Sequence, residues 1–400
     1  MTHLQSLIPT PSMPPHLPTY KTMSEHQRVY DLIWSQMPHM QKRTSSTWWY
    51  FILFPQDAEG YGPRQLMFSI ATAVNKHPIH ISDLELPGLD LRREIKDGVD
   101  RFAAAAVGWY YDGRTLHENI LHTTAVTHLS LPDRTIACWD EGQDGQRQGY
   151  TICASAARPL ALEAHIEGAN GRAHFTAWGD LNCLDNAPHE SININTPIAG
   201  THFIAWRRMH FEGEFDLPGT GRERLAGYGY FQRVCLNVPT FPWKWIWALF
   251  PDGAMFSSYV PYVGLNLFRK GYHFYDSNRK EQAAISISGK SFWDWPDDSE
   301  RIWLAQHTRV TPVLGRGEHP QFEVSAGNKA GDFVQFTAVP YAHTGFFLER
   351  PRWRARSHWN YNEYLFRMEN LQGQIQGRPI NRESMGQGFG NLEYTWGLGL

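Results

Sequence analysis

One aromatic, strand-like stretch occurs twice in this chain of 400 residues, and this repeat constrains the fold more than any other feature. Residues 49–55 read WYFILFP and residues 245–251 read WIWALFP. Downstream of each copy, an Arg-Met pair precedes a glycine-rich aromatic stretch, within residues 208–230 and 367–390. Copies of an opening strand and of a closing hairpin, in the same order, predict two similar β-domains in tandem.

Short β-type runs follow one another along most of the chain, for example at residues 66–70, 123–127 and 333–337. Gly, Asp, Asn and Pro separate them at the spacing typical of sandwiches and barrels. Two Asp-Gly pairs, at 112–113 and 252–253, carry the hairpin signal. We therefore predict an all-β fold of two barrel or sandwich domains with few short helices. The helix candidates are residues 23–41 and, interrupted by a glycine, residues 89–106.

Proline content marks the expected boundaries. Residues 1–22 are rich in Pro, Thr and Ser, which predicts a disordered or loosely attached arm. A second proline-containing stretch, residues 237–242, has the composition of a linker. We predict one β-domain over residues 23–236 and a second over residues 237–400.

Composition excludes several classes of function. Charged residues are 19% of the chain, aromatic residues are 14%, and the formal net charge is −3. Without a long run of Lys or Arg, we expect no nucleic-acid partner. The apolar runs are strand-sized, so we expect no integral membrane segment. Four cysteines without a CxxC pair, and no N-terminal secretory pattern, favour a cytoplasmic protein. The oligomeric state does not follow from the sequence.

Sequence motifs for nucleotide-driven and serine-hydrolase chemistry are absent: there is no Walker A loop, no GxGxxG after a strand and no GxSxG elbow. The 19 histidines do not assemble into a set of three or four converging metal ligands. We expect neither a cofactor nor a metal.

Three stretches carry a resemblance to a known family. Residues 47–51 (TWWYF) are similar to an opening Glu-Trp-Trp-Tyr strand, and residues 388–397 (GFGNLEYTWG) to a closing Gly-x-Gly-Tyr-Leu-Glu-Leu-Thr-Gly strand. Residues 227–252 lie where that family has its central block, a Trp-x-Trp strand and an Asp-Gly turn. The chain thus resembles the lipocalin-like superfamily of carotenoid 1,2-hydratase and AttH-type proteins. More distantly, it resembles tocopherol cyclase and the fungal decalin-forming Diels–Alderases.

The resemblance implies two tandem lipocalin-like (calycin-type) domains and an apolar small-molecule substrate. One departure limits it. Many members carry a polar block with an acid or imidazole in the central strand, whereas residues 230–235 read YFQRVC. Carotenoid hydration by a residue of that block is therefore not implied for this chain.

Aromatic residues are the predicted walls of a ligand site. Strand alternation puts Trp243, Trp245 and Trp247 on one face. Indoles lining a cavity would bind a flat or polyene-like ligand and stabilise a developing carbocation. The alternative is a tryptophan-packed core between the domains. The predicted walls also include Trp49, Tyr228 and Tyr230.

Five polar residues are the predicted catalytic set. Gln232 and Arg233 are hydrogen-bond donors suited to a substrate carbonyl, although Arg233 would equally serve a salt bridge. Glu393 would be a general acid if it were buried, or else a structural residue. His202 is an acid–base candidate, and Asp252 is first of all a turn residue.

The sequence therefore favours a cofactor-independent enzyme of secondary metabolism, a cyclase, isomerase or hydratase. Its substrate would be a terpenoid- or polyketide-like molecule held within or between the two domains. A non-catalytic carrier of an apolar ligand is the main alternative, since it needs the same cavity. A carbohydrate-active protein is a third reading, which the sequence favours least because no two acids fall visibly on neighbouring inward positions.

Overall fold

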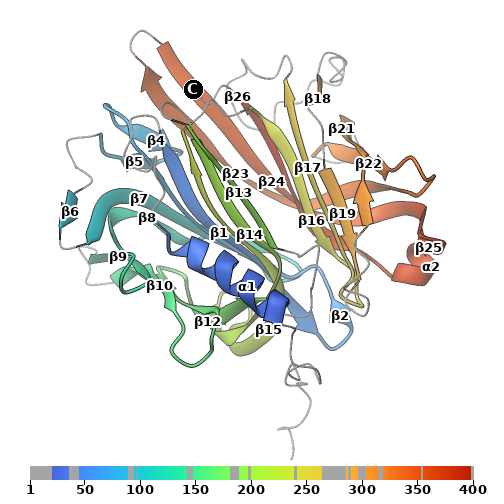
Figure 1. Ribbon diagram of the computed structural model, residues 1–400, viewed down its shortest axis with the longest axis horizontal. Helices are drawn as coiled ribbons and strands as arrows, with labels where there is room; N and C mark the ends of the chain where they lie inside the picture. Colours follow the sequence, from blue (N-terminus) through green and yellow to red (C-terminus); the bar gives the residue numbers. More distant parts are fainter. Residues whose placement is uncertain are drawn as a thin grey trace, which may run out of the picture.

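The computed structural model describes residues 20–35, 45–88, 94–96, 98–141, 147–180, 189–196, 200–237, 241–263, 285–286, 290–295, 303–313, 319–352 and 355–397. The expected arm at residues 1–22 lies outside this part except for its last three residues, which begin helix α1 (Tyr20–Ile33). A second helix, α2 (Arg382–Met385), is one turn long. Among the residues just given, everything else regular is β-structure, arranged as two large sheets side by side (Figure 1).

The first sheet is a closed barrel. From β12 its strands run in the order β11, β10, β9, β8, β7, β3, β1, β15 and β14, and β14 pairs again with β12, which closes a ring of 10 strands. Closure leaves these strands without free edges. The strands of this sheet are β1 (Ser46–Asp57), β2 (Gly60–Tyr61), β3 (Gln65–Ala73), β6 (Glu94–Lys96), β7 (Val99–Tyr111), β8 (Leu116–Ser130), β9 (Thr135–Glu141), β10 (Arg147–Ala154), β11 (Ala161–Gly168), β12 (Gly171–Gly179), β13 (His189–Asn195), β14 (Gly200–Leu217) and β15 (Gly221–Leu236).

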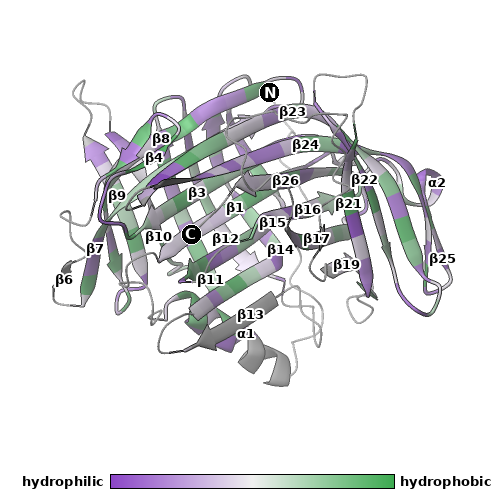
Figure 2. Ribbon diagram, turned by 90° about the horizontal axis from the view of Figure 1, so that it is seen from above, coloured by the Kyte–Doolittle hydropathy of each residue, from purple (hydrophilic) through white to green (hydrophobic). Residues whose placement is uncertain are grey.

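The second sheet has the order β20-β19-β17-β16-β26-β24-β23-β22-β21. Its long hairpin β23–β24 extends over the first half of the molecule, where β23 pairs with β4 (Figure 2). Its strands are β4 (Ile79–Ile81), β5 (Leu84–Leu86), β16 (Trp243–Leu249), β17 (Met255–Val263), β18 (Ile285–Ser286), β19 (Lys290–Asp294), β20 (Trp303–Ala305), β21 (His307–Val313), β22 (Gln321–Gly327), β23 (Phe333–Arg352), β24 (Ala355–Ile375), β25 (Arg378–Asn381) and β26 (Phe389–Gly397).

The predicted all-β fold is confirmed, and the two copies of the repeat occupy equivalent places. The opening strand β1 pairs with β15, the last strand of the first sheet in sequence order. In the second sheet, β16 likewise pairs with the last strand in sequence order, β26. The division at residue 237 stays a prediction. Two strands from the first half of the sequence, β4 and β5, belong to the second sheet.

The predicted helix at residues 89–106 is wrong where the structure describes it. Its last eight residues lie in β7, which pairs with β8. The reason is the alternation of small and apolar side chains: Phe102, Ala104 and Ala106 face the barrel interior, while Ala105 packs on the other side. A sequence rich in alanine matches either period, and tertiary packing decides between them.

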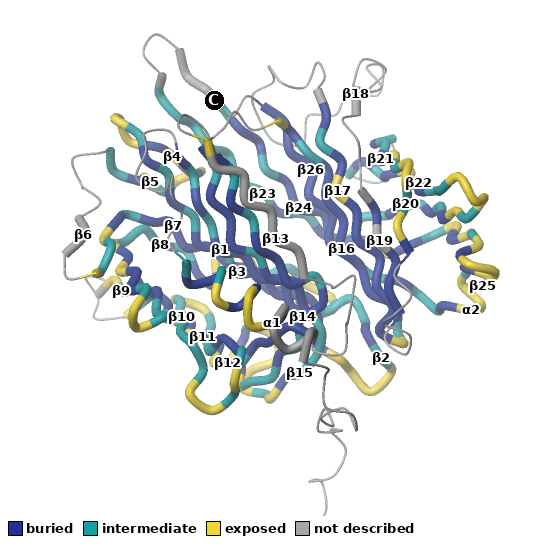
Figure 3. Tube along the Cα trace, in the orientation of Figure 1, coloured by how far each residue is buried: buried dark blue, intermediate teal, exposed yellow. Residues whose placement is uncertain are grey.

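Apolar side chains form three main clusters. One fills the barrel, together with the apolar face of α1, and one fills the second sheet's concave side. The third cluster lies between the sheets and joins residues of β1, β7 and β15 to residues of β16 and β24. We call this layer the seam. The strands that flank it are the most deeply buried part of the chain, whereas exposed residues gather at the outer hairpins (Figure 3).

Candidate functional site

Two glutamates face each other across neighbouring strands at the seam. The register of β24 with β26 places Glu363 directly opposite Glu393. Their sequence neighbours Tyr364, Leu392 and Tyr394 point into the second core, so alternation turns both carboxyl groups towards the first sheet. Glu363 is 0% and Glu393 is 4% exposed. The reasoning from sequence found no such pair, because it lies in strand register rather than in spacing along the chain.

Aromatic donors hold both carboxyl groups. Trp109 Nε1, from β7 of the barrel, donates to Glu363 Oε2 at 2.6 Å across the seam. Trp243 Nε1 donates to Glu393 Oε2 at 2.6 Å, and the Tyr361 hydroxyl donates to Glu393 Oε1 at 2.5 Å. Hydrogen bonds to a carboxylate are short and strong. The pair is therefore fixed in position by residues of both sheets.

Burial changes the protonation of this pair. Removal from water raises the pKa of Glu393 well above the ordinary carboxyl range, and the two aromatic donors only partly oppose that shift. The pKa of Glu363 is raised further, because the charge of Glu393 adds to the effect of burial. Two carboxyl groups this close cannot readily both ionise. At neutral pH the pair therefore retains a proton that it can give to a ligand.

The walls around the glutamates are aromatic. Tyr50 of β1 and Tyr230 of β15 contact Trp245 of β16, with ring centroids 6.1 and 4.8 Å apart. The Tyr230 hydroxyl donates to Gln232 Oε1 at 2.9 Å. Five predicted site residues thus meet at this end of the seam: Gln232, Tyr230, Trp243, Trp245 and Glu393.

Two predicted wall residues lie elsewhere on the seam. Trp247 packs on Phe54, with ring centroids 5.0 Å apart, and its Nε1 donates to the Arg207 carbonyl at 2.7 Å. Tyr228 stacks on Tyr61, with ring centroids 5.3 Å apart. Trp247 therefore links the two sheets, whereas Tyr228 packs within the seam.

Three other predicted residues face the opposite side of the first sheet. Trp49, Arg233 and His202 lie in or beside the barrel core under α1. The Arg233 guanidinium donates to the Ile33 carbonyl and, at 3.1 Å, to the Ser35 carbonyl, so it caps the end of α1. Gln232 and Arg233 are adjacent, and adjacent residues of a strand point to opposite faces. Arg233 therefore does not join the glutamates.

His202 is not poised as an acid–base group near neutral pH, because burial and the neighbouring charge of Arg233 lower its pKa to about 4. Asp252 is an exposed turn residue whose Oδ1 accepts from the Ala254 backbone N–H at 2.9 Å. This contact is the one that an Asp-Gly turn predicts.

Sequence reasoning missed Glu363, Tyr361 and Trp109. The first two lie in residues 360–364 (NYNEY), a stretch of one strand that mixes polar and aromatic side chains. The two-residue period of a strand puts Tyr361 and Glu363 on one face, but which residues they meet there depends on pairing. Trp109 comes from another sheet, and no local signal marks it.

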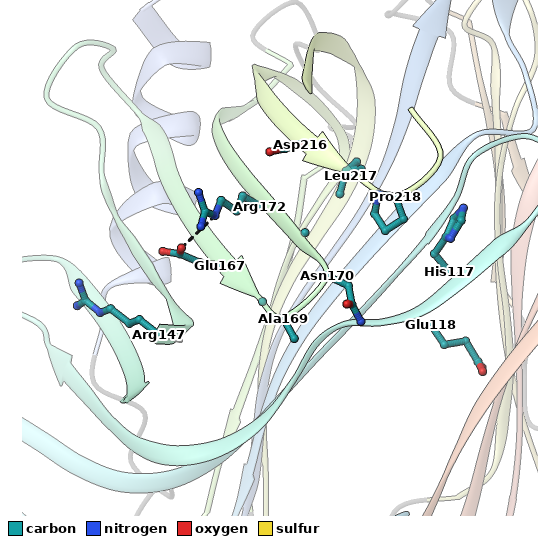
Figure 4. A pocket seen from close by; sticks show the side chains of 12 residues that line it. His117, Glu118, Arg147, Glu167, Ala169, Asn170, Arg172, Asp216, Leu217 and Pro218 are labelled. Atoms are coloured by element: carbon teal, nitrogen blue, oxygen red, sulfur yellow. Dashed lines mark ion pairs between the residues drawn. The ribbon is translucent and has the colours of Figure 1, made fainter. Parts of the chain in front are cut away.

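A second candidate is an open pocket of about 900 Å³ at one end of the barrel (Figure 4). Several of its polar lining residues already have partners within the protein. Arg172 pairs with Glu167 at 3.0 Å, His117 with Asp112 at 2.9 Å, and Glu118 accepts from Thr344 at 2.7 Å. This pocket therefore ranks below the seam.

Among the described residues, no group of three or more His, Cys, Asp or Glu side chains is arranged to hold a metal ion. Of the described cysteines, Cys138 and Cys235 are buried thiols and Cys153 is half-buried, whereas Cys183 lies outside the described residues. Neither helix in the described part is long and apolar enough to cross a bilayer.

No protein-family model and no curated protein sequence matches this chain. Solved structures do resemble it. CghA is 8% identical over 88% of each chain, with a TM-score of 0.46. A protein described as AttH from Nitrosomonas europaea is 11% identical over 90% of this chain and 96% of its own, with a TM-score of 0.45. Kievitone hydratase from Nectria haematococca is 12% identical over 88% of each chain, with a TM-score of 0.40.

At these identities and TM-scores, the likenesses carry no statement about what this chain does.

Proposed function

We propose that this chain is a cofactor-independent enzyme that isomerises, cyclises or hydrates an apolar, terpenoid- or polyketide-like small molecule at the seam. One observation carries the proposal: two fully buried carboxyl groups, Glu363 and Glu393, stand opposite each other in an aromatic layer. A carboxyl group kept protonated near neutral pH is a general acid.

The surroundings suit a substrate with an apolar skeleton. Tyr230 and Trp245 present ring faces beside the pair, and such faces stabilise cationic charge as it develops on carbon. Binding against rigid rings also holds the substrate in a reactive conformation, which lowers the entropic part of the activation free energy. We therefore propose a reaction that needs only proton transfer and a substrate held in its reactive conformation.

Paired carboxyl groups also serve glycoside hydrolysis. That reading is less well supported, because the indole N–H groups of Trp109 and Trp243 are already bonded to the glutamates.

The test separates an enzyme from a carrier. Apolar material that co-purifies with the protein is extracted, then incubated in D₂O with wild-type protein or with the double variant Glu363→Gln/Glu393→Gln. We expect wild-type protein to convert the extracted ligand to a new chromatographic species, and the double variant to bind it without conversion. Recovery of unchanged ligand from the wild-type protein would contradict the proposal and favour a carrier. Deuterium bound to carbon in the product would identify a protonation step.

A further inference from the structure

The two glutamates differ in how many of their carboxyl oxygens accept a hydrogen bond. Both oxygens of Glu393 accept a hydrogen bond, one from Trp243 and the other from Tyr361. For Glu363, only Oε2 accepts a bond, from Trp109, and Oε1 has no hydrogen-bond partner among the described residues. Glu363 is 0% exposed, so bulk water does not reach this oxygen.

Two more buried polar groups lie near the Glu363 carboxyl group without a hydrogen bond of good geometry. Asn391, on β26, is close enough to oppose the rise that burial causes in the pKa of Glu363, yet neither end of its amide is bonded. The Tyr50 hydroxyl, on β1, is likewise unbonded, and burial, with the charge of Glu363 as a second cause, raises its pKa. Asn391 is 0% and Tyr50 is 2% exposed. A buried polar group without a partner destabilises the fold, so three such groups near one another point to a site that a ligand completes.

From these contacts we propose that Glu363 is the proton donor of the site and that Glu393 is a positioning residue. The inference rests on the proposed function and assigns roles within it. Glu393 is held at both oxygens and so cannot reach a substrate without breaking a bond. Its negative charge keeps the proton on Glu363, which has the open oxygen and lies near Asn391 and Tyr50.

The same groups specify what the substrate must carry. The Asn391 amide N–H, the Tyr50 hydroxyl and the protonated Glu363 are all donors. Together they suit a carbonyl oxygen on an otherwise apolar molecule. In the step we infer, the Glu363 O–H bond breaks, a new O–H bond forms on the substrate oxygen, and the carbonyl carbon becomes electrophilic. After the rearrangement, the proton returns to Glu363.

Single variants test this assignment with the ligand and turnover assay described above. We expect Glu363→Gln to lose at least about 100-fold in rate, since general acid catalysis contributes on that scale. Glu393→Gln should retain turnover, but its activity should fall at a lower pH than in wild-type protein, because Glu363 then gives up its proton more easily. Glu369→Gln, an ion-paired residue further along β24, is the matched control and should match wild type.

A titration provides a readout that does not depend on turnover. In protein with ¹³C-labelled glutamate side chains, NMR should show two carboxyl groups that titrate above the ordinary range. Glu363→Gln should remove the higher of the two, and Glu393→Gln should move the remaining one down. Near-UV circular dichroism checks that each variant is folded.

The outcomes separate this inference from the proposed function. Retained turnover in Glu363→Gln, or equal losses in both variants without a change in the pH profile, would overturn the assignment and leave the proposed function standing. Absence of turnover in wild-type protein would remove the proposed function itself. The titration then still shows whether Glu363 is the last to lose its proton.

Discussion

At the scale of single residues, burial determines what each polar side chain does. Glu363 and Arg233 are both 0% exposed. Glu363 lies at the seam, whereas Arg233 lies on the other side of the first sheet, under α1. Arg233 donates to backbone carbonyls at the end of α1, and its ring contact with Trp49, 5.1 Å from guanidinium carbon to centroid, completes that environment. Glu363 keeps an oxygen without a partner among the described residues. Arg233 is therefore a structural group, and Glu363 is a candidate for chemistry.

The stability of the protein should fall as the pH rises above the ordinary carboxyl range. The pKa values of Glu363 and Glu393 are raised in the folded state, so the folded protein binds these protons more tightly than the unfolded chain. Their contribution is fully present below the unfolded pKa of about 4.3, and it is lost as the pH rises through the folded values. For each group, a pKa higher by one in the folded state corresponds to about 1.4 kcal/mol.

Glu363→Gln should therefore flatten the decline in melting temperature between about pH 5 and pH 9. Differential scanning calorimetry of wild-type protein, the variant and the Glu369→Gln control provides the measurement. An unchanged slope in Glu363→Gln would mean that the carboxyl group is ionised in the folded protein.

Arg233→Ala should destabilise the protein by about 2 kcal/mol or more, because the two carbonyls that it caps lose a buried donor. Urea unfolding monitored by tryptophan fluorescence measures the loss. The control is Arg222→Ala, since Arg222 is an exposed residue paired with Glu214 and its substitution should leave stability close to that of wild type. Equal effects of the two substitutions would show that the cap is not energetically important.

At the scale of elements, the two copies of the repeat differ by one step of alternation. Trp49 and Trp245 align in sequence, yet Trp49 faces the barrel interior and Trp245 faces the seam. A shift of one residue turns every side chain of a strand to the other face. The sequence repeat therefore predicted the strands and their pairing, whereas it could not predict which of the two aligned tryptophans lines the site.

Closure of the barrel depends on a glycine where β14 crosses β12. Gly213 pairs with Phe175, and a Cβ added to Gly213 would lie 2.2 Å from the His174 carbonyl oxygen and 2.5 Å from the Phe175 Cα. Backbone atoms cannot move away as a flexible side chain can. Gly213→Ala should therefore separate β12 from β14 locally and cost about 1–3 kcal/mol.

Hydrogen exchange of the β12 and β14 amides measures this separation directly. In the control Gly62→Ala, the nearest atom to the added Cβ is the end of the Asp57 side chain at 3.7 Å, so exchange should stay as in wild type. Unchanged protection in Gly213→Ala would show that the strands tolerate the methyl group.

At the scale of the whole molecule, a buried ion pair joins the two sheets. A bulge in β14 between Trp206 and Met209 directs Arg208 to Asp294 of β19, with 3.0 Å between Nε and Oδ2. Both side chains are at most 2% exposed. Burial raises the pKa of Asp294 to about 6, against the opposing charge of Arg208. Because bulges re-aim side chains, this irregularity positions one sheet on the other.

Arg208→Met should destabilise the protein by about 3–5 kcal/mol, because it leaves the Asp294 carboxylate buried without its cation. The double variant Arg208→Met/Asp294→Leu should recover most of that loss. A double-mutant cycle measured by urea unfolding gives the coupling between the two sites. If the double variant were as unstable as the sum of the single variants, the pair would not act as a unit.

The sequence was sufficient for the fold class, since strand periodicity and turn residues are local properties. Five residues that it proposed for a site also lie at the candidate site, and their roles stay predictions. It was insufficient for the glutamate pair, because Glu363 and Glu393 meet through the register of two strands. It was also insufficient for Trp109, which reaches Glu363 from the other sheet. Such contacts depend on how complete sheets dock.

The bond from Trp109 to Glu363 makes the candidate site a joint product of the two sheets. Tyr50 and Trp109 come from the first sheet, whereas both glutamates and Trp243 come from the second. A fragment that ended near residue 237 would therefore lack the two carboxyl groups, and a fragment that began there would lack the indole that anchors Glu363.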